Sequence, residues 1–464
     1  MELTLPVRKY WPIIIIRITF DSVNNIFGEK VDSIMRWIVL VFLFLLSVLN
    51  YTDKSVLGLA AQPIMSELDL SYDQFGLVGS IFFVTYALGG ILIGVLTYRI
   101  NTKYLLIMIA LGWTVSLASA YFVESLMQLM LLRAVLGFFE GGTYALCVVH
   151  LARWFNSAER GVTSAIMTSG TVFGTYIAAP LLVMGITNIG WQHTFALLGL
   201  ASLIWAFLFF FMRDEPKEPL VEDVKSLASN QDRPFKDILK VFLNPYVFST
   251  LVISFVAMWI STWIITWAPT YLIQIVGLEP QLMSIIFAII GVSGAVYAIF
   301  IGKFSDVLFK KNKSLVKSYD RILVINLSIG ATAFLLTTFV TSPVLACILL
   351  GVALVINASL LPLNTAIKTM AIPKNLLGSV LGIAMPISSM AGVISPWITG
   401  YLVESAGEDI RLGFNSGVLL VVGLYVLTAI ILLVTRNMKI TTTEKENVLQ
   451  VNEEKKSLDV ALEK

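Results

Sequence analysis

Four ionisable residues interrupt stretches that are otherwise apolar. Asp53 and Lys54 stand in the first such stretch, and Arg133 and Glu140 stand in the fourth. A charged side chain at membrane depth costs roughly 3 kcal/mol, so each of the four needs a reason to be there. A carboxylate in such surroundings can bind and release a proton, and a guanidinium can hold a carboxylate with two parallel hydrogen bonds. The residue types therefore predict a site for an organic anion and for protons.

The spacing of the four residues limits which of them can pair. Arg133 and Glu140 are seven residues apart, which puts them on nearly the same helix face about 10.5 Å apart along the axis. Asp53 and Lys54 are neighbours and point about 100° apart, so both cannot serve one partner. One alternative stays open, in which the charges form an internal network that only ties two helices together. A spare cation and a spare carboxylate favour the anion and proton site.

The elements that must position these residues are membrane-spanning helices. Of the 464 residues, 57% are apolar and only 13% are charged, and the mean hydropathy is +0.85. A net charge of +2 excludes a nucleic-acid binder, and short alternating strands of a β-barrel are missing. We predict an all-α polytopic membrane protein with twelve transmembrane helices, near 36–62, 75–99, 104–122, 125–153, 160–185, 192–212, 246–276, 282–308, 321–340, 343–370, 376–402 and 412–435.

One long hydrophilic interruption divides the twelve stretches into two sets of six. The predicted organisation is an N-terminal cytoplasmic extension, an N-terminal six-helix half, a cytoplasmic linker, a C-terminal six-helix half and a cytoplasmic tail, at 1–35, 36–212, 213–245, 246–436 and 437–464. The extension is interpreted either as a surface amphipathic piece or as sequence upstream of a translation start at Met35. Lys and Arg concentrate in the loops that share a side with the N-terminus, so both termini are predicted to be cytoplasmic.

The fifth and eleventh stretches look like copies of one unit. Each has a first glycine, a second glycine and a proline at similar spacing, namely Gly161, Gly174 and Pro180 in one and Gly378, Gly392 and Pro396 in the other. Parallel six-helix repeats place a substrate site between the halves at mid-membrane. Four prolines give places where a helix can bend: Pro269, Pro362, Pro386 and Pro396.

Nothing in the sequence predicts an enzyme, a metal site or a cofactor. Cys147, Cys347, His150 and His193 are isolated from each other and from acidic clusters, so they are interpreted as buried or structural residues. The proton is the only coupling species that we expect.

Five segments carry a family resemblance. They are Asn50–Lys54, Arg133–Gly142, Trp154–Gly161, Thr266–Gln274 and Met390–Leu402, in this order on spans 1, 4, 4 to 5, 7 and 11. Together they resemble the anion:cation symporter branch of the major facilitator superfamily over about 36–436. That branch includes bacterial hexonate and hexuronate permeases and the vesicular glutamate and sialic acid carriers.

The resemblance implies proton-coupled symport of a small organic anion, such as a sugar acid, by alternating access. Asp53 and Glu140 would carry protons, while Lys54 and Arg133 would pair with them or face the substrate. Lys54 replaces the Arg of the family pattern, so the bidentate fork is lost at that position. The remaining substrate-site candidates are Tyr51 and Tyr86 on cavity-lining positions, Thr171 and Ser389 where hexonate carriers have amides, and Trp267 and Asn364 from spans 7 and 10.

The superfamily's loop signature is present only in part. Between spans 2 and 3 it retains Arg99 and Lys103, and the matching loop after span 8 retains Gly302 and Asp306. We interpret these four as a conformational latch. Lys368, near the end of span 10, is expected to extend to the cytoplasmic surface.

The expected partners are the small organic anion and the lipid bilayer, with no nucleic acid and a monomeric chain in the cytoplasmic (inner) membrane. Two rivals stay open. One is an exporter or importer of a larger polycarboxylate such as a siderophore, and the other is a membrane-embedded enzyme or sensor.

Overall fold

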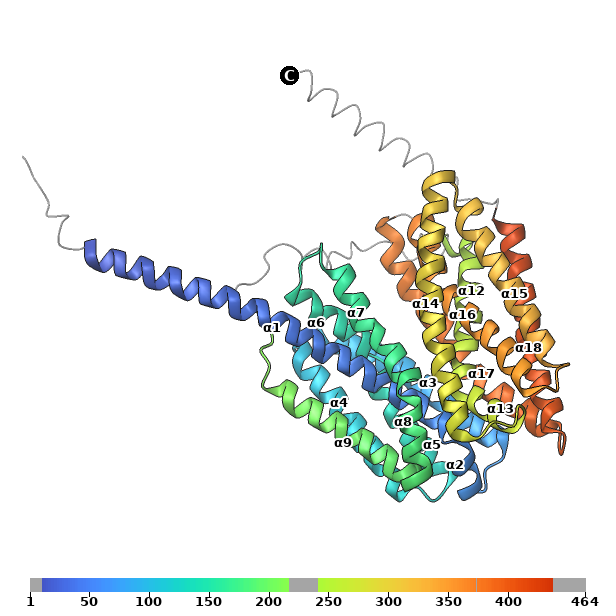
Figure 1. Cartoon of the computed structure of the whole chain (residues 1–464). Coiled ribbons are helices and arrows are strands. Elements are labelled where there is room, and N and C mark those ends of the chain that lie inside the picture. The colour runs from blue at the N-terminus through green and yellow to red at the C-terminus, as the bar shows by residue number, and fades with distance from the viewer. Residues whose placement is uncertain (1–10, 217–240, 373, 437–464) are drawn as a thin grey trace, which may run out of the picture.

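The computed structural model describes residues 11–216, 241–372 and 374–436, and these form a helical bundle in two halves (Figure 1). Eleven of its helices are long and apolar enough to cross a membrane, and one further pair of helices forms a bent span. This confirms the predicted twelve-span architecture. Most of the predicted linker and the whole predicted tail lie outside the described residues.

The N-terminal half contains spans 1 to 6. Its elements are α1 (Trp11–Leu59), α2 (Ala61–Glu67), α3 (Tyr72–Leu96), α4 (Thr102–Ala118), η2 (Ser119–Phe122), α5 (Leu126–Glu140), α6 (Thr143–Trp154), α7 (Arg160–Val172), η3 (Phe173–Ile177), α8 (Ala179–Ile189) and α9 (Trp191–Phe210).

The C-terminal half contains spans 7 to 12. Its elements are α12 (Pro245–Thr266), α13 (Ala268–Gln274), α14 (Pro280–Asn312), η4 (Val316–Asp320), α15 (Arg321–Thr337), α16 (Pro343–Ala371), α17 (Lys374–Ser405) and α18 (Ile410–Thr435).

The helix boundaries follow from local sequence chemistry. The side chain of Asn244 accepts hydrogen bonds from the first free N–H groups of α12, which begins with Pro245. Asn101 caps α4 in the same way. Gly141 and Gly142 separate α5 from α6, so that the fourth span consists of two helices with a break directly after Glu140.

Prolines accompany two interruptions of the spans. Span 5 passes through a π-helical turn, η3, and bends by 42° before α8, which has Pro180 in its first turn. Span 7 breaks at Trp267, next to Pro269, as predicted. Pro362, Pro386 and Pro396 lie inside helices that continue past them, so a bend at these three positions stays a prediction.

Two helices extend beyond the spans predicted from the sequence. The first candidate span, Ile34–Leu59, agrees with the predicted start near residue 36, but α1 itself begins at Trp11. The segment containing Gly302 and Asp306 is not a loop, because α14 continues to Asn312. In both places the helical backbone extends beyond the apolar stretch from which the span was predicted.

The two halves contact each other mainly at one end of the bundle. We call this the distal end, and the opposite end, where Asp214 and Asn244 flank the linker, the linker end. At the distal end the hydroxyl of Tyr72 donates to Gln274 at 2.6 Å, and the Gln274 amide donates to Gln62 at 2.6 Å. Towards the linker end the halves diverge (Figure 1).

Glycines allow the close approach of the halves at the distal end. A Cβ on Gly58 of α1 would lie 2.0 Å from the carbonyl oxygen of Ile265 in α12. A Cβ on Gly400 of α17 would lie 2.3 Å from the carbonyl oxygen of Tyr72 in α3. Any side chain at these positions would force the backbones apart. The conformation is therefore one that is closed at the distal end.

Candidate substrate and proton site

A buried ion pair joins span 1 to span 4. The Nζ of Lys54 lies 3.2 Å from Oε2 of Glu140, and both side chains are almost fully buried. Asn50 bridges the pair, because its Oδ1 accepts from Lys54 at 2.7 Å and its Nδ2 donates to Glu140 at 2.9 Å. Asn50 and Lys54 meet because they are four residues apart on one helix face. The three side chains satisfy one another without a ligand.

Two tyrosine rings complete the surroundings of Lys54. Its ammonium group lies 4.4 Å from the ring centre of Tyr51 and 4.9 Å from that of Tyr86. Aromatic faces stabilise a cation in desolvated surroundings. Both tyrosines were predicted to line the site, and the structure places both against the predicted cation.

Asp53 and Arg133 lie beside this network but are not paired. Neither carboxylate oxygen of the fully buried Asp53 has a hydrogen-bond partner among the described residues. The guanidinium of Arg133 donates to the backbone carbonyl of Asp53 at 3.4 Å and lies 4.3 Å over the ring of Phe82. Within the described parts of the chain it forms no ion pair. Arg133 is therefore the uncommitted cation of the site.

These contacts favour one of the two interpretations of the four charges, the anion and proton site. A network that only ties helices together would satisfy all four residues. Only Lys54 and Glu140 satisfy each other in this way. The carboxylate of Asp53 can still bind a proton, and the guanidinium of Arg133 can still bind an anion. The sequence correctly brought the four residues together but could not assign which cation takes which carboxylate.

Thr171 and Ser389 lie on the repeated spans 5 and 11 and are both partly exposed. Thr171 is next to the last residue of α7, just before the π-helical turn. Ser389 donates to the carbonyl of Met385 at 3.0 Å. Neither makes a hydrogen bond to the four charges among the residues described, so their assignment to the substrate site stays a prediction.

Trp267 is not in the cavity in this conformation, contrary to the prediction. Its side chain is fully buried, and its indole N–H donates to the carbonyl of Pro396 at 2.9 Å. The ring packs on Tyr72 and Phe75 of α3, with centroid distances of 6.1 and 5.6 Å. Trp267 thus belongs to the contact that closes the distal end. Its assignment to the substrate site rested on its position in span 7 alone.

Asn364 and Lys368 also differ from expectation. Asn364 donates to the carbonyl of Thr250 and to the hydroxyl of Ser254, both at 2.8 Å, so it ties span 10 to span 7. Lys368 does not extend to the surface. It is 5% exposed and donates to Ser254 at 2.6 Å.

Two of the four predicted latch residues make side-chain hydrogen bonds, and each of these bonds stays within one half. Arg99 is exposed, while Lys103 donates to the carbonyl of Met212 at 2.6 Å. Gly302 has open space around it, and Asp306 accepts a short hydrogen bond from Tyr319. A contact between the halves through these four residues is not formed in this conformation.

Sequence reasoning missed a polar cluster at the linker end of the N-terminal half. Asp214 accepts from Arg153 at 3.0 Å and from Asn101, and it lies 4.0 Å from His150. Asp214 thus joins the loop between spans 2 and 3 to span 4. Asn50 and Phe82 were also missed as site residues. The sequence signal for Asn50 was its spacing, because it lies four residues before Lys54 on the same helix face.

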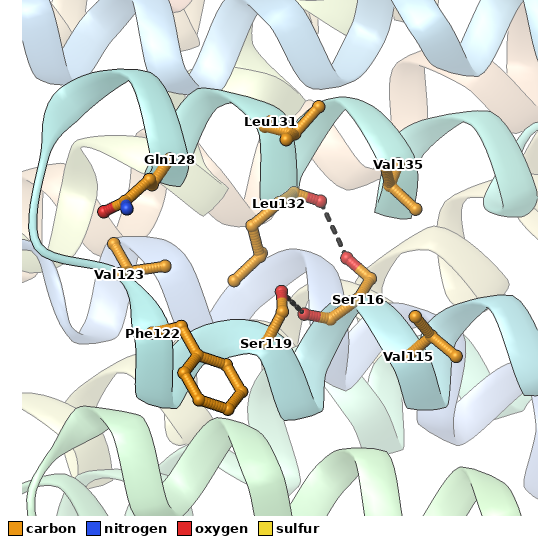
Figure 2. A pocket seen from close by; sticks show the side chains of 9 residues that line it. All are labelled: Val115, Ser116, Ser119, Phe122, Val123, Gln128, Leu131, Leu132 and Val135. Atoms are coloured by element: carbon orange, nitrogen blue, oxygen red, sulfur yellow. Dashed lines mark hydrogen bonds between the residues drawn. The ribbon is translucent and has the colours of Figure 1, made fainter.

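An apolar pocket of about 300 Å³ lies between α4, η2 and α5 near the distal end, and none of the four charges lines it (Figure 2). Figure 2 shows Ser116 and Ser119 in it, and both hydroxyls donate to backbone carbonyls, that of Ser116 to Leu132 at 2.7 Å and that of Ser119 to Ser116 at 2.6 Å. Leu131 and Phe122 on its rim are strongly exposed, as is typical of a lipid-facing surface. This pocket offers no charge to an anion. Within the described ranges no group of three or more His, Cys, Asp or Glu could hold a metal ion.

Comparison with protein families and solved structures gives a consistent result. The family described as Major Facilitator Superfamily matches residues 43–319. A crystal structure of a bacterial homolog of the lysosomal transporter Spinster, in an inward-facing and unoccupied conformation, superposes with a TM-score of 0.75 at 17% identity, covering 88% of this chain and 98% of that one. A D-xylose-proton symporter superposes with a TM-score of 0.69 at 14% identity, over 85% of this chain and 96% of that one. These likenesses show the fold.

Curated relatives cover most of the chain. A hexuronate transporter of Bacillus subtilis is 29% identical over 403 residues, which is 84% of this chain and 92% of that protein. A probable sulfoacetate transporter of Cupriavidus necator is 28% identical over 408 residues, with the same shares. A probable galactarate/D-glucarate transporter of Bacillus subtilis is 25% identical over 452 residues, or 87% of this chain and 92% of that protein.

Proposed function

This chain belongs to the Major Facilitator Superfamily and is a transporter rather than an enzyme, and we propose that it carries a small organic anion of the sugar-acid class together with protons. The relatives named for hexuronate and for galactarate/D-glucarate support the substrate class. The enzyme alternative is excluded, because the family and these relatives are transporters.

One observation carries the proposal: a closed Lys54–Asn50–Glu140 network stands beside an Asp53 carboxylate and an Arg133 guanidinium that are unpaired within the described residues. A carboxylate buried without a hydrogen bond is more stable with its proton than without it. Asp53 is therefore the proton carrier in this conformation, and Arg133 is the group to which a substrate carboxylate binds.

The contacts suggest how proton and anion are linked. Protonation of Glu140 removes the negative partner of Lys54, and the freed ammonium group then attracts the substrate anion. Binding of one proton for each negative charge of the substrate leaves the net charge of the site unchanged, so the halves can rock around the loaded site as they do around the empty one. In the empty site the Lys54–Glu140 pair neutralises itself. Transport by alternating access would follow from these two states of equal charge.

The membrane orientation belongs to the same proposal. The loops at the linker end carry most of the Lys and Arg residues, for example Lys310 and Lys311 at the end of α14. By the positive-inside rule the linker end and both termini face the cytoplasm of a bacterial inner membrane. The conformation described here would then be inward-facing, because it is closed at the distal end.

The deciding experiment is uptake into proteoliposomes that contain the purified chain, with and without an inward proton gradient. We expect a hexuronate or hexonate to accumulate only with the gradient. Arg133→Gln is expected to abolish substrate binding. Glu140→Gln is expected to stop accumulation while exchange of internal for external substrate continues.

Three outcomes would contradict parts of this proposal. Gradient-driven accumulation by Glu140→Gln would show that Glu140 does not carry the coupled proton. Transport of a neutral sugar but of no organic anion would contradict the proposed anion site. Efflux of a larger polycarboxylate from inverted vesicles, without uptake of sugar acids, would favour the exporter. Lys311→Gln, on an exposed residue, serves as the control for loss of a positive charge.

A further inference from the structure

The C-terminal half contains a buried cation that lacks a counter-ion. Lys368 of α16 is 5% exposed, and its one hydrogen bond among the described residues goes to the neutral hydroxyl of Ser254. No described carboxylate pairs with it. An ammonium group away from water costs several kcal/mol unless an anion compensates it. Ser254 supplies an oxygen but no charge.

The direction of the helix explains why Lys368 does not reach the surface. Side chains on a helix lean toward its N-terminus. Span 10 begins at the distal end, so Lys368, three residues before the end of α16, leans back into the membrane. Its ammonium group reaches Ser254, which lies nine residues inside α12, about 13 Å from the linker end of that helix. The cation is therefore held at depth.

The two halves contain the same local pair with different partners. Asn50 and Lys54 are four residues apart in span 1, and Asn364 and Lys368 are four residues apart in span 10. In the N-terminal half the Asn amide and the Lys ammonium both donate to one carboxylate, that of Glu140.

In the C-terminal half the corresponding groups both donate to one hydroxyl, that of Ser254. The Oδ1 of Asn364, also buried, has no partner within the described residues. The C-terminal pair thus has the donors of the N-terminal pair without the negative charge that they surround.

We propose that Lys368, Ser254 and Asn364 form a second anion site, and that the substrate is a dianion whose second acidic group binds there. This inference rests on the proposed transport of an organic anion and narrows it to dicarboxylates or sulfonate–carboxylates. The substrate's second acidic group supplies the charge that Glu140 supplies in the N-terminal half. Ser254 and Asn364 then orient it, because a hydroxyl donates to an anion as readily as it accepts from an ammonium group.

The placement of the two sites suits one extended small molecule. Spans 7 and 10 are the repeat counterparts of spans 1 and 4, so the two Asn–Lys pairs belong to opposite walls of the space between the halves. Glu140 lies fourteen residues from the end of α6, about 21 Å from the linker end, against about 13 Å for Ser254. The ammonium group of Lys54 lies 3.2 Å from Glu140, so the two ammonium groups differ in depth by about 8 Å. An anion that binds both must therefore extend along the membrane normal.

The test compares two sugar acids of equal carbon number in proteoliposomes. Galactarate carries two carboxylates and galacturonate carries one. For the unaltered chain we expect a KM for galactarate at least about tenfold below that for galacturonate, since each charge-assisted hydrogen bond contributes a factor of that order. Lys368→Gln is expected to raise the galactarate KM about tenfold and to leave the galacturonate KM within about twofold.

Two further variants separate charge from structure. Lys368→Arg keeps the charge and should keep the preference for galactarate. Ser254→Asp places a carboxylate where Glu140 stands in the other half, so it should pair with Lys368 and remove the preference while the protein stays folded. Lys311→Gln should change neither KM, because Lys311 is exposed at the end of α14.

The outcomes distinguish this inference from the function on which it rests. Transport of galacturonate but not galactarate would overturn the second site and leave the proposed function standing. Equal loss of both substrates in Lys368→Gln would also overturn it, as would an unchanged preference in folded Ser254→Asp. If neither acid nor sulfoacetate is transported, the proposed function itself fails.

Discussion

The two halves of this transporter share an architecture but not a charge distribution. In the N-terminal half an Asn–Lys pair surrounds the carboxylate of Glu140, with Asp53 and Arg133 close by. In the C-terminal half an Asn–Lys pair surrounds the hydroxyl of Ser254. The first arrangement is balanced without a ligand, and the second is not. We therefore expect the N-terminal half to handle protons and to bind one acidic group of the substrate through Arg133, and the C-terminal half to offer a second cation, Lys368, to the other acidic group.

The largest expected effect comes from removing the negative partner of the Asn50–Lys54 pair, which makes it resemble the Asn364–Lys368 pair. Glu140→Gln leaves Lys54 buried without a negative partner, which should lower the free energy of unfolding by about 3 kcal/mol. The measurement is thermal unfolding of the purified variants in detergent. Lys54→Gln combined with Glu140→Gln removes both charges and should recover most of the loss. A double variant as unstable as Glu140→Gln would mean that the pair contributes through shape rather than charge.

A second prediction concerns the contact between the two halves at the distal end, which is closed in this conformation. Gly58→Ala places a Cβ against the carbonyl of Ile265, so the distal end should open more often. We expect a cysteine at Thr266, which is 4% exposed, to react about tenfold faster with an impermeant maleimide added from the distal side.

The labelling needs a background without Cys147 and Cys347, which are the two natural thiols. Gly302→Ala is the matched control, because the space beside Gly302 is open. Unchanged labelling in Gly58→Ala would show that the close backbone contact does not hold the distal end shut.

A third prediction separates the two carboxylates of the N-terminal half. Asp53→Asn should change the free energy of unfolding by no more than about 1 kcal/mol, because the carboxylate makes no hydrogen bond that the amide would lose. The same variant should stop proton-driven accumulation in proteoliposomes. A loss of stability as large as that of Glu140→Gln would show that Asp53 is ionised and paired rather than protonated.

The smallest expected effect concerns an ion pair of the same half that is not deeply buried. Arg36 and Glu159 lie 3.2 Å apart with about a third of each side chain exposed. Arg36→Gln should cost less than about 1 kcal/mol in thermal unfolding, since water compensates exposed charges. An effect equal to that of Glu140→Gln would mean that burial is not what distinguishes the site.

Much of the architecture was predictable from local signals. Twelve apolar stretches gave the spans, and the seven-residue spacing of Arg133 and Glu140 gave their common helix face. Pairing was not predictable, because it depends on which helices adjoin and how far each is rotated. Trp267 illustrates the limit: its sequence position suggested a cavity wall, whereas contacts with the other half make it part of the distal closure. Lys368 illustrates a second limit, because its side chain leans toward the N-terminus of its helix, and the end of the bundle at which span 10 begins decides whether that is into the membrane.

The sequence by itself determined the fold class, the number of spans and the four charges that interrupt the apolar stretches, because a lipid environment makes every apolar stretch and every charge within one significant. Only the tertiary structure decided that Lys54 pairs with Glu140, that Asp53 and Arg133 remain uncommitted, and that Lys368 faces a hydroxyl. Ion pairs form over a few ångströms between helices far apart in the sequence, and such distances are set by packing alone.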